Sequence, residues 1–339
     1  MAQGYEASIE AAREAVAKEL STGLPSSATV AIMVDGKTVY AEGFGLRDRA
    51  KNLPVETDTQ FNVGSVSKVF TAASILVLEQ EGKLSLDKPV ADYIPDFTMN
   101  DTRYQDITIR MLLNHTSGFP GTNVKDGFTA VKNRNYVEET LERLKINNLV
   151  NDPGKISIYC NDGFTIAEAV IEHVSGMSFP DFLEKKIFNQ MGLDNTSAYY
   201  KDGNQNIARV YEKDSIAPLP VEYVNILGSG GISSTAIDLC KYGEILQSGT
   251  ILNPAIIEEY SKAQYGPETV PAREPLFNAG LGWDYVQVHK FKNQGIDVLA
   301  KNGGTLQYYS QLYVLPKDCL LYTSPSPRDR TRSRMPSSA

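Results

Sequence analysis

Two different spacings of apolar residues occur in the first part of the chain, and each predicts a different kind of element. Residues 5–22 carry apolar side chains three or four positions apart, which is typical of an amphipathic helix. That stripe consists of Ile9, Ala12, Val16 and Leu20. The next stretch contains the pair Asp35-Gly36, a favoured two-residue hairpin turn, so residues 29–34 and 37–42 are predicted to be paired strands.

Beyond the hairpin, the apolar pattern becomes nearly continuous. Residues 69–78 are apolar on almost every side, which predicts a buried helix that ends at Gly82. Helical patterns dominate between about 83 and 200, and strand-like runs return at 280–316. Two capping residues, Thr235 and Asn253, predict further helices between these regions.

This order of elements predicts an α/β (α+β) fold, in which a sheet flanked by helices carries an inserted all-helical region. With 339 residues, the chain exceeds the size at which one core stops growing, so two packed regions are expected. The sheet domain would comprise residues 5–82 and 200–318, and the all-helical insertion residues 83–199.

The end of the chain has a different composition. From Thr323 onward it holds four arginines, three prolines and five serines, a composition that buries too little apolar surface to fold. The stretch 319–329 resembles the translation of a sequencing-library adapter, and such segments are set aside in fold reasoning. We therefore expect residues 319–339 to be a disordered, artefactual tail, and the C-terminal strand and helix to be missing.

Charge and composition exclude several classes of function. The net charge of -8 argues against nucleic acid as the main partner, because phosphate binding needs a basic face. The chain contains neither G-x-G-x-x-G nor a P-loop, which argues against a nucleotide-binding enzyme. The longest apolar runs fall short of the roughly 18 residues that a membrane span needs. Charged residues within the first helix pattern argue against a signal peptide and favour the cytoplasm, although a secreted or cell-envelope location stays open.

Cysteine and histidine give no support for a metal or a disulfide framework. The three cysteines form no C-x-x-C pair, and the three histidines are far apart in the sequence. These residues are Cys160, Cys240 and Cys319, and His115, His173 and His289. No cofactor and no metal are expected.

One short motif points to chemistry. Ser65 lies three residues before Lys68 at the start of the predicted buried helix, so both would lie on one face at its N-terminus. A serine hydroxyl is a poor nucleophile until a nearby base takes its proton, and a lysine in a dry pocket can be or can assist that base. The same spacing recurs at Ser85 and Lys88, where it lies in a loop and indicates a solvated turn.

Two further motifs accompany Ser65. Tyr159 and Asn161 form Y-x-N after a Pro-Gly turn and before a helical pattern. Lys301 follows an apolar strand and opens K-N-G-G, in which Gly303 would allow backbone to approach a ligand closely. Each motif alone is weak, since Y-x-N also occurs at 223–225.

Together the motifs resemble those of the serine β-lactamase-like family. The order is S-x-x-K, then LLNHTSG at 112–118, Y-x-N, GSGGISST at 228–235, GLGW at 280–283, and K-x-G-G. The resemblance covers about residues 5–318, and it is closest to the branch of class C β-lactamases, D-alanyl-D-alanine carboxypeptidases and related esterases. It implies a mostly antiparallel sheet with flanking helices. It also implies a serine hydrolase that forms an acyl-enzyme with a small ester, amide or β-lactam.

The resemblance also implies residue roles. Ser65 would be the nucleophile, Lys68 and Tyr159 would share the proton transfer, and Asn161 would position the acyl chain. The N–H groups of Ser65 and Gly304 would form the oxyanion hole. Lys301 would attract a substrate carboxylate, with Asn302 and Gly303 lining the same edge. Asn302 stands where the family often has a hydroxyl residue, which favours an esterase over a β-lactamase or peptidase.

The identity of the base can be argued from charge. Lowering the pKa of a tyrosine by about three units needs about 4 kcal/mol, roughly what one ammonium at ~4 Å supplies at an effective dielectric of ~20. Two lysines near Tyr159 would exceed that, so Tyr159 is favoured as the base, assisted by Lys68. Two alternatives remain: a Ser-His hydrolase that uses His115, and a non-catalytic penicillin-recognising binding or sensor protein.

Overall fold

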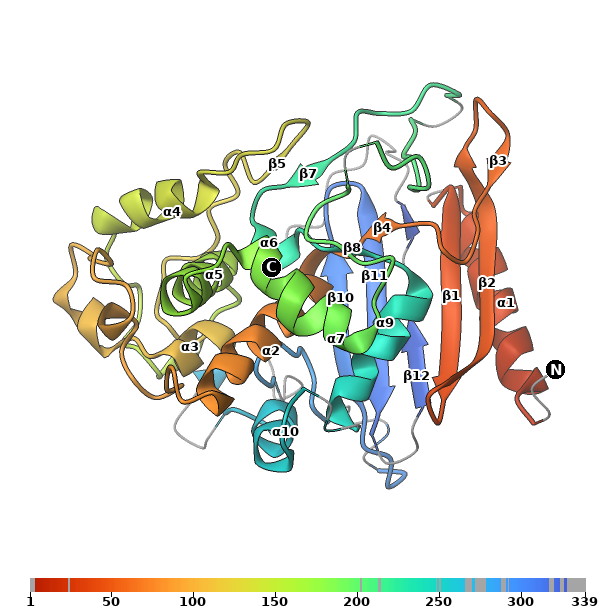
Figure 1. Cartoon of the computed structure of the whole chain (residues 1–339). Coiled ribbons are helices and arrows are strands. Elements are labelled where there is room, and N and C mark those ends of the chain that lie inside the picture. The colour runs from red at the N-terminus through yellow and green to blue at the C-terminus, as the bar shows by residue number, and fades with distance from the viewer. Residues whose placement is uncertain are drawn as a thin grey trace.

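The structure is a computed structural model. It describes residues 4–323 except 24, 202, 213–214, 248, 250, 266–269, 272–278, 288–290, 292 and 317–319, together with residues 326–327. A twisted sheet stands beside a mostly helical region, and helix α2 (Ser67–Gln80) runs between them (Figure 1). The expected combination of a sheet with flanking helices is confirmed.

The main sheet is antiparallel throughout. Its strands, in spatial order, are β10 (Leu299–Gly304), β11 (Tyr308–Leu315), β12 (Leu320–Thr323), β1 (Ser27–Val34), β2 (Lys37–Asp48) and β3 (Leu53–Pro54). The predicted hairpin is confirmed, with Val34 opposite Lys37 and both turn residues, Asp35 and Gly36, at positive φ. Strand β10, which carries the K-N-G-G motif, lies at the end of this order. It contacts the turn Gly64–Val66 that leads into α2.

Both faces of the sheet are covered. Helix α1 (Glu6–Ser21) buries Ala12 and Val16 against Val30 and its neighbours on β1. The alternate residues of β1, such as Ala31, belong to the large core on the other face, where α9 (Ala236–Gly243) packs. The predicted amphipathic helix is therefore confirmed, and its apolar stripe is the reason it packs on the sheet.

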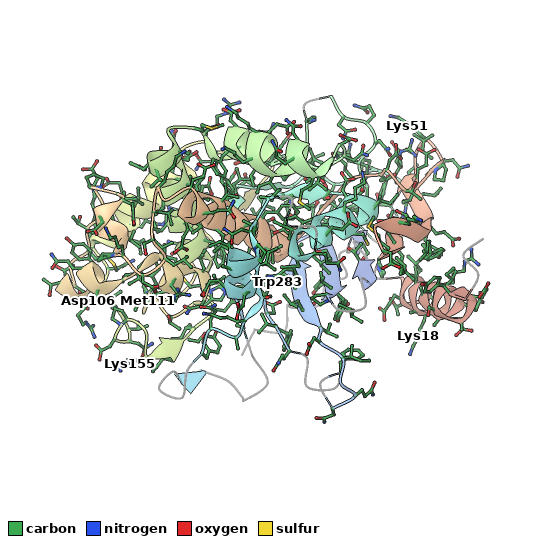
Figure 2. The ribbon with its side chains drawn as sticks, turned by 60° about the horizontal axis from the view of Figure 1, so that its bottom comes forward. Lys18, Lys51, Asp106, Met111, Lys155 and Trp283 are labelled. Carbon is green, nitrogen blue, oxygen red and sulfur yellow. The ribbon has the colours of Figure 1, made fainter. Side chains whose placement is uncertain are left out.

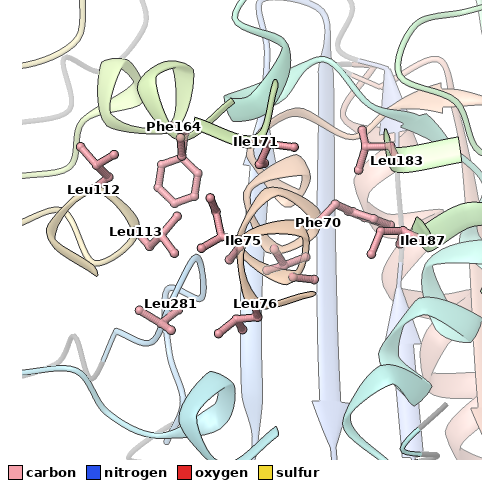
Figure 3. Close-up of a cluster of buried hydrophobic side chains, with 14 of the residues drawn as sticks. Phe70, Ile75, Leu76, Leu112, Leu113, Phe164, Ile171, Leu183, Ile187 and Leu281 are labelled. Carbon is pink, nitrogen blue, oxygen red and sulfur yellow. The ribbon is translucent and has the colours of Figure 1, made fainter. Parts of the chain in front are cut away.

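Helix α2 is the centre of the large core. Every residue from Ser67 to Leu78 is buried, and the buried helix predicted from the apolar stretch 69–78 is confirmed. Phe70, Ile75 and Leu76 project from it in different directions (Figure 3). Around them lie side chains of three neighbouring segments, including Leu112, Leu113, Phe164, Ile171, Leu183 and Ile187. A helix enclosed in this way holds its first turn rigidly; that turn carries Lys68, and Ser65 lies in the 3-10 turn Gly64–Val66 directly before it.

The region 83–199 is mostly helical. Its helices are η2 (Val90–Asp92), η3 (Thr102–Asp106), α3 (Ile109–Leu113), α4 (Tyr136–Lys145), α5 (Asn161–Ser175), α6 (Phe179–Leu183), the π-helix η4 (Glu184–Phe188) and α7 (Asn189–Met191). The expectation of an all-helical region is wrong in one detail. Two short strands, β5 (Phe128–Thr129) and β6 (Ile156–Ser157), pair with β7 (Tyr223–Val224) and β9 (Val270–Pro271). These pairings tie the helical region to later segments of the chain. The division into two domains stays a prediction.

The remaining elements are β4 (Phe61–Asn62), η1 (Gly64–Val66), α8 (Leu227–Gly230), β8 (Ser233–Ser234), η5 (Glu244–Leu246), α10 (Pro254–Ser261) and β13 (Ser326–Pro327). Of these elements, η1, α8 and α10 contact α2. Both predicted N-caps are confirmed, because Thr235 accepts from the N–H of Asp238 and Asn253 from that of Ile256. The strand expected at 280–291 is wrong for its described part. There the chain makes a single bridge, Tyr285 to Ala300, and the segment turns instead into the core.

The expectations about the chain's end are also wrong at the described residues. Residues 320–323 form β12, which fills the place between β11 and β1 and pairs with both. Thr323 is buried, and residues 326–327 pair with β11. The physical reason is that two open strand edges face each other there, and a short L-L-Y-T segment can satisfy their backbone groups whatever follows it. The prediction for residues 328–339 lies outside the described residues.

Candidate active site

The site forms where η1 leads into α2 beneath the end of β10. Gly64 has φ +51°, and a Cβ there would lie 2.6 Å from the backbone nitrogen of Gly304. A Cβ on Gly303 would lie 2.0 Å from the carbonyl oxygen of Val63. Glycine is therefore required on both sides of this contact. The close approach brings the N–H of Gly304 beside the N-terminal turn that carries Ser65, as an oxyanion hole requires.

Lys68 lies directly below Ser65 and is completely buried. Its Nζ donates at 3.2 Å to Ser65 Oγ and at 2.7 Å to Asn161 Oδ1. It also donates to Ser229, at 2.9 Å to the carbonyl oxygen and 2.7 Å to Oγ. Ser229 Oγ in turn donates to Asn161 Oδ1 at 2.7 Å. The amine is therefore held by uncharged partners drawn from α2, α5 and α8.

These surroundings disfavour a charge on Lys68. Burial lowers the pKa of Lys68 well below its ordinary value, and the nearby charge of Lys301 lowers it further, although Asp284 opposes both. The Ser229 hydroxyl donates its proton to Asn161 and therefore does not compete for the lone pair of a neutral Lys68 amine. When the amine is neutral, the Ser65 hydroxyl can donate its proton into that lone pair. Lys68 thus has the position of a general base, and the direction of its pKa shift favours that role.

Tyr159 lies at the mouth of the site and is 46 % exposed. Its side chain interacts with those of Ser65 and Lys301. Burial of the hydroxyl end raises the pKa of Tyr159, Lys301 lowers it, and Asp284 raises it again, with a net rise. The exposure of the rest of the ring limits that rise. This direction favours the protonated hydroxyl, and the expectation that Tyr159 is the base stays a prediction.

His115 supports Tyr159 from behind. The two rings lie 4.3 Å apart between centroids, tilted by 33°. The Nδ1 of His115 accepts from the backbone N–H of Cys160 at 3.1 Å, and burial lowers the pKa of the ring well below its ordinary value. A neutral imidazole whose Nδ1 is committed to the backbone positions the Tyr159 segment. This geometry argues against the Ser-His alternative.

Lys301 has an ion-pair partner that the sequence analysis missed. Its Nζ lies 2.5 Å from Asp284 Oδ1, and the backbone N–H of Asn302 donates to Asp284 Oδ2 at 3.0 Å. Burial lowers the pKa of Lys301, but Asp284 and Tyr159 outweigh burial and raise it, so this lysine is charged. Asp284 directly follows the G-L-G-W motif, so its position could have been noted in the sequence. No pattern in the sequence, however, predicts its contact with Lys301.

The other expected site residues are placed as follows. Asn161 belongs to the site, but its Oδ1 is occupied by Lys68 and Ser229, so it holds the amine in place. Asn302 projects an exposed side chain from β10. The second S-x-x-K copy is a turn with an exposed Lys88, and in the second Y-x-N the amide of Asn225 bonds to backbone of the 126–131 loop. Ser229, on α8 in the G-S-G-G stretch, is a second site residue that the sequence analysis did not identify.

A buried carboxyl group, that of Glu168, holds the segment that carries Ser229. Glu168, on α5, accepts at 2.7 Å from the backbone N–H of Gly228, directly before Ser229. Thr71 on α2 donates to the carbonyl oxygen of the same glycine at 2.5 Å. The turn that holds Lys68 is therefore anchored to two helices. Burial raises the pKa of Glu168 to about 8.

We expect this carboxyl group to make the folded state less stable at high pH. Between its ordinary pKa of 4.5 and about 8, the folded state keeps a proton that the unfolded state has lost, so the free energy of unfolding falls as pH rises. The effect is on the order of a few kcal/mol. Glu168→Gln should flatten the decline between pH 5.5 and 8.5 in urea denaturation. The exposed Glu142→Gln is the matched control, and an equal slope in both variants would contradict the assignment.

Neither a metal nor a membrane helix is apparent in the described part of the chain. There, His, Cys, Asp and Glu form no cluster of three or more that could hold a metal ion. The helices described are all too short or too polar to cross a bilayer.

Comparison with known proteins identifies a family for this chain. The family model described as Beta-lactamase matches residues 13–320. A penicillin-binding protein of Bacillus subtilis (strain 168) is 26 % identical over 324 residues, covering 89 % of this chain and 68 % of the relative. A putative penicillin-binding protein of the same strain is 26 % identical, with 80 % and 64 % covered. An unguisins hydrolase of Aspergillus violaceofuscus is 24 % identical, with 84 % and 55 % covered. The chain thus spans 55–68 % of these relatives' own lengths.

Solved structures show the same fold. A class C beta-lactamase superposes with a TM-score of 0.78 at 21 % identity, covering 98 % of this chain and 94 % of that chain. An octameric penicillin-binding protein homologue from Pyrococcus abyssi gives 0.75 at 22 % identity, covering 94 % and 73 %. Identities this low carry information about the fold alone.

Proposed function

This chain belongs to the beta-lactamase family, and from that premise we propose that it is a serine hydrolase that forms an acyl-enzyme on Ser65. The observation that carries the proposal is the buried amine of Lys68, whose pKa is lowered, 3.2 Å from the Ser65 hydroxyl. A nucleophile beside a neutral base at the N-terminus of a rigid helix is the arrangement that acyl transfer needs.

In the proposed acylation, Lys68 accepts the hydroxyl proton while Ser65 Oγ bonds to the substrate carbonyl carbon. The electron pair of the carbonyl bond moves to its oxygen, which the N–H groups of Ser65 and Gly304 stabilise. The tetrahedral intermediate then collapses: the electron pair on the oxygen re-forms the carbonyl bond, and the bond to the leaving group breaks. That group takes a proton from the Tyr159 hydroxyl, and the proton held by Lys68 restores that hydroxyl, which returns Lys68 to its neutral state. Water later attacks the acyl-enzyme by the same sequence and releases the acid.

Lys68 is the proposed base in place of Tyr159, because the charge argument changes once Asp284 is included. The positive charge of Lys301 is matched by the carboxylate of Asp284, 2.5 Å away, and Lys68 has a lowered pKa. Little net positive charge is left to stabilise a tyrosinate. Tyr159 then acts as a proton donor and relay between Ser65 and the leaving group, since its side chain interacts with that of Ser65.

We propose small esters as the favoured acyl donors. Asn302 stands where a hydroxyl would help to hold a substrate carboxylate, and its backbone N–H is already bonded to Asp284. The relatives named as penicillin-binding proteins and as a hydrolase support acyl transfer as the chemistry, but not a particular substrate.

The test is steady turnover of a short activated ester such as 4-nitrophenyl butyrate. We expect continuous hydrolysis, with kcat/KM higher than for a cephalosporin, measured by absorbance with the same preparation. A stoichiometric burst without turnover would support the non-catalytic binding alternative. Faster hydrolysis of the cephalosporin would contradict the preference for esters while leaving the nucleophile assignment intact.

A further inference from the structure

The K-N-G-G edge of the site is already occupied by a carboxylate of the chain itself. Asp284 places Oδ1 2.5 Å from Lys301 Nζ and Oδ2 3.0 Å from the N–H of Asn302. An ammonium and a backbone N–H that converge on two oxygens form a typical binding geometry for a carboxylate. The resemblance of the sequence to its family assigned this position to a carboxylate of the substrate.

Asp284 is held there by the segment that precedes it. Gly282 has φ +77°, and its N–H donates to the carbonyl oxygen of Leu113 at 3.0 Å. A Cβ on Gly282 would lie 2.7 Å from the carbonyl oxygen of Lys68, so the segment presses directly on α2. Trp283 is buried in the core, and Figure 2 labels it near the centre of the view, with Lys18 and Lys155 near the edge.

The carboxylate is also attached to the strand beside it. The backbone N–H of Asp284 donates to the carbonyl oxygen of Ala300 at 3.1 Å, and Tyr285 forms a bridge with Ala300. Ala300 directly precedes Lys301 on β10. Both members of the ion pair are therefore positioned by adjoining backbone, which holds the two side chains within contact distance of each other.

The positive charge of Lys301 is already matched by Asp284, 2.5 Å away. A second carboxylate brought to Lys301 would meet Asp284 at short range. It would have to displace Asp284 from a lysine that is 1 % exposed, leaving Asp284 without its partner.

We infer that Asp284 determines the charge of the acyl donor, by occupying the anion position so that the site accepts uncharged acyl groups and rejects those that carry a carboxylate. This inference rests on the proposed function, because it names the substrate class of the same site. It assigns Asp284 as a specificity-determining residue.

The experiment compares two esters of equal chain length, 4-nitrophenyl valerate and the mono-4-nitrophenyl ester of glutaric acid, which differ by a terminal carboxylate. In Asp284→Asn, we expect the ratio of kcat/KM for the glutarate ester to that for the valerate ester to rise about tenfold or more, the scale of one charge-assisted hydrogen bond. Asparagine keeps an acceptor for the Asn302 N–H but frees the charge of Lys301.

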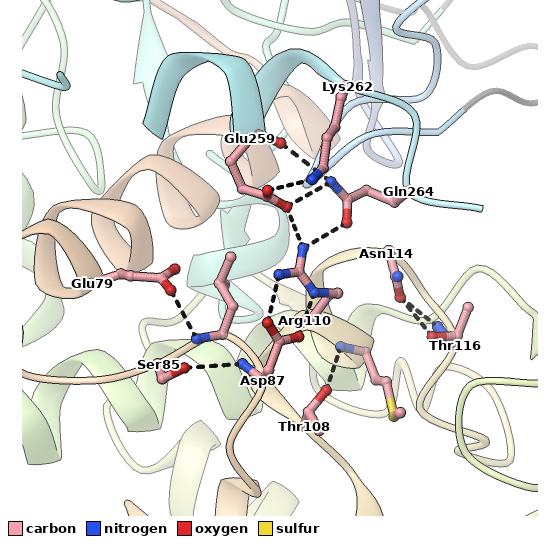
Figure 4. Close-up of polar contacts among 12 residues, drawn as sticks. Glu79, Ser85, Asp87, Thr108, Arg110, Asn114, Thr116, Glu259, Lys262 and Gln264 are labelled. Carbon is pink, nitrogen blue, oxygen red and sulfur yellow. Dashed lines mark hydrogen bonds and ion pairs between the residues drawn. The ribbon is translucent and has the colours of Figure 1, made fainter. Parts of the chain in front are cut away.

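Two variants show that the gain depends on the freed lysine. Adding Lys301→Met to Asp284→Asn should return the ratio to the wild-type value. Asp87→Asn removes a carboxylate from the Arg110 ion pair away from Ser65 (Figure 4) and should leave the ratio unchanged. An unchanged ratio in Asp284→Asn, or equal losses on both esters, would overturn the inference and leave Asp284 as a structural partner of Lys301.

A binding measurement separates this inference from the proposed function. Failure of the wild-type chain to form an acyl adduct on Ser65 would refute the proposed function alone.

The inference can then be tested by binding, with glutarate titrated calorimetrically into Ser65→Ala and into Ser65→Ala/Asp284→Asn. Binding at least about tenfold tighter in the double variant supports the inference, and equal affinity overturns it. Asp284→Ser serves as a second variant, and failure of both Asp284 variants to fold would also overturn a role limited to specificity.

Discussion

Replacing Ser65 with alanine is expected to remove covalent labelling completely and to reduce ester turnover by at least about 10⁴-fold, the scale seen when a serine nucleophile is deleted. The hydroxyl is the atom that bonds to the acyl carbon, and alanine offers no substitute. Intact mass after treatment with a fluorophosphonate should show one adduct on the wild-type chain and none on Ser65→Ala.

Ser85→Ala is the matched control for this experiment. Ser85 shares the S-x-x-K spacing but lies in a turn, where its Oγ accepts from the N–H of Asp87 at 3.4 Å (Figure 4). We expect its adduct and its rate to equal those of the wild type. An adduct that persists in Ser65→Ala would refute the nucleophile assignment, and the labelled peptide would identify the residue responsible.

Lys68→Met is expected to lower kcat/KM for a neutral ester by about 10²–10⁴-fold, the usual contribution of a positioned general base. In the wild type, protonation of Lys68 blocks proton transfer from Ser65. Activity should therefore fall as pH drops through the lowered pKa of Lys68. The variant should lose this acid limb, and a pH–rate profile measures it. Because the change removes the hydrogen bonds that Lys68 donates to Asn161 and to the Ser229 carbonyl oxygen, a thermal melt must accompany the kinetics.

Two other variants test the assignment of Lys68. Tyr159→Phe should leave the acid limb in place, because the proposed relay donates a proton and is not the base. His115→Ala should lower stability by about 1–3 kcal/mol, since the Cys160 N–H loses its acceptor, while the rate per folded molecule falls less. A folded His115→Ala that no longer forms an acyl-enzyme would favour the Ser-His alternative. Loss of the acid limb in Tyr159→Phe would return the role of base to Tyr159.

Local rules predicted much of the fold. The apolar stripe of α1, the Asp35-Gly36 hairpin and the caps Thr235 and Asn253 are each specified by neighbouring residues, and each is confirmed. The expectations for the described part of 280–291 and for residues 320–323 and 326–327 failed for a shared reason. Whether a short segment pairs as a strand depends on which edges are open beside it, and those edges belong to distant parts of the chain.

For the site, the sequence by itself predicted which reactive side chains lie together. The spacing of Ser65 and Lys68 on a uniformly apolar helix follows from helical periodicity, and the glycines of K-N-G-G allow the close backbone contact that the structure contains. Only the tertiary structure decided how those groups are charged. Asp284 reaches Lys301 because the G-L-G-W segment turns into the core and forms a bridge to β10, and Ser229 reaches Lys68 across 161 residues of sequence. Protonation depends on burial and on charges a few ångströms away in space, and sequence order encodes neither directly.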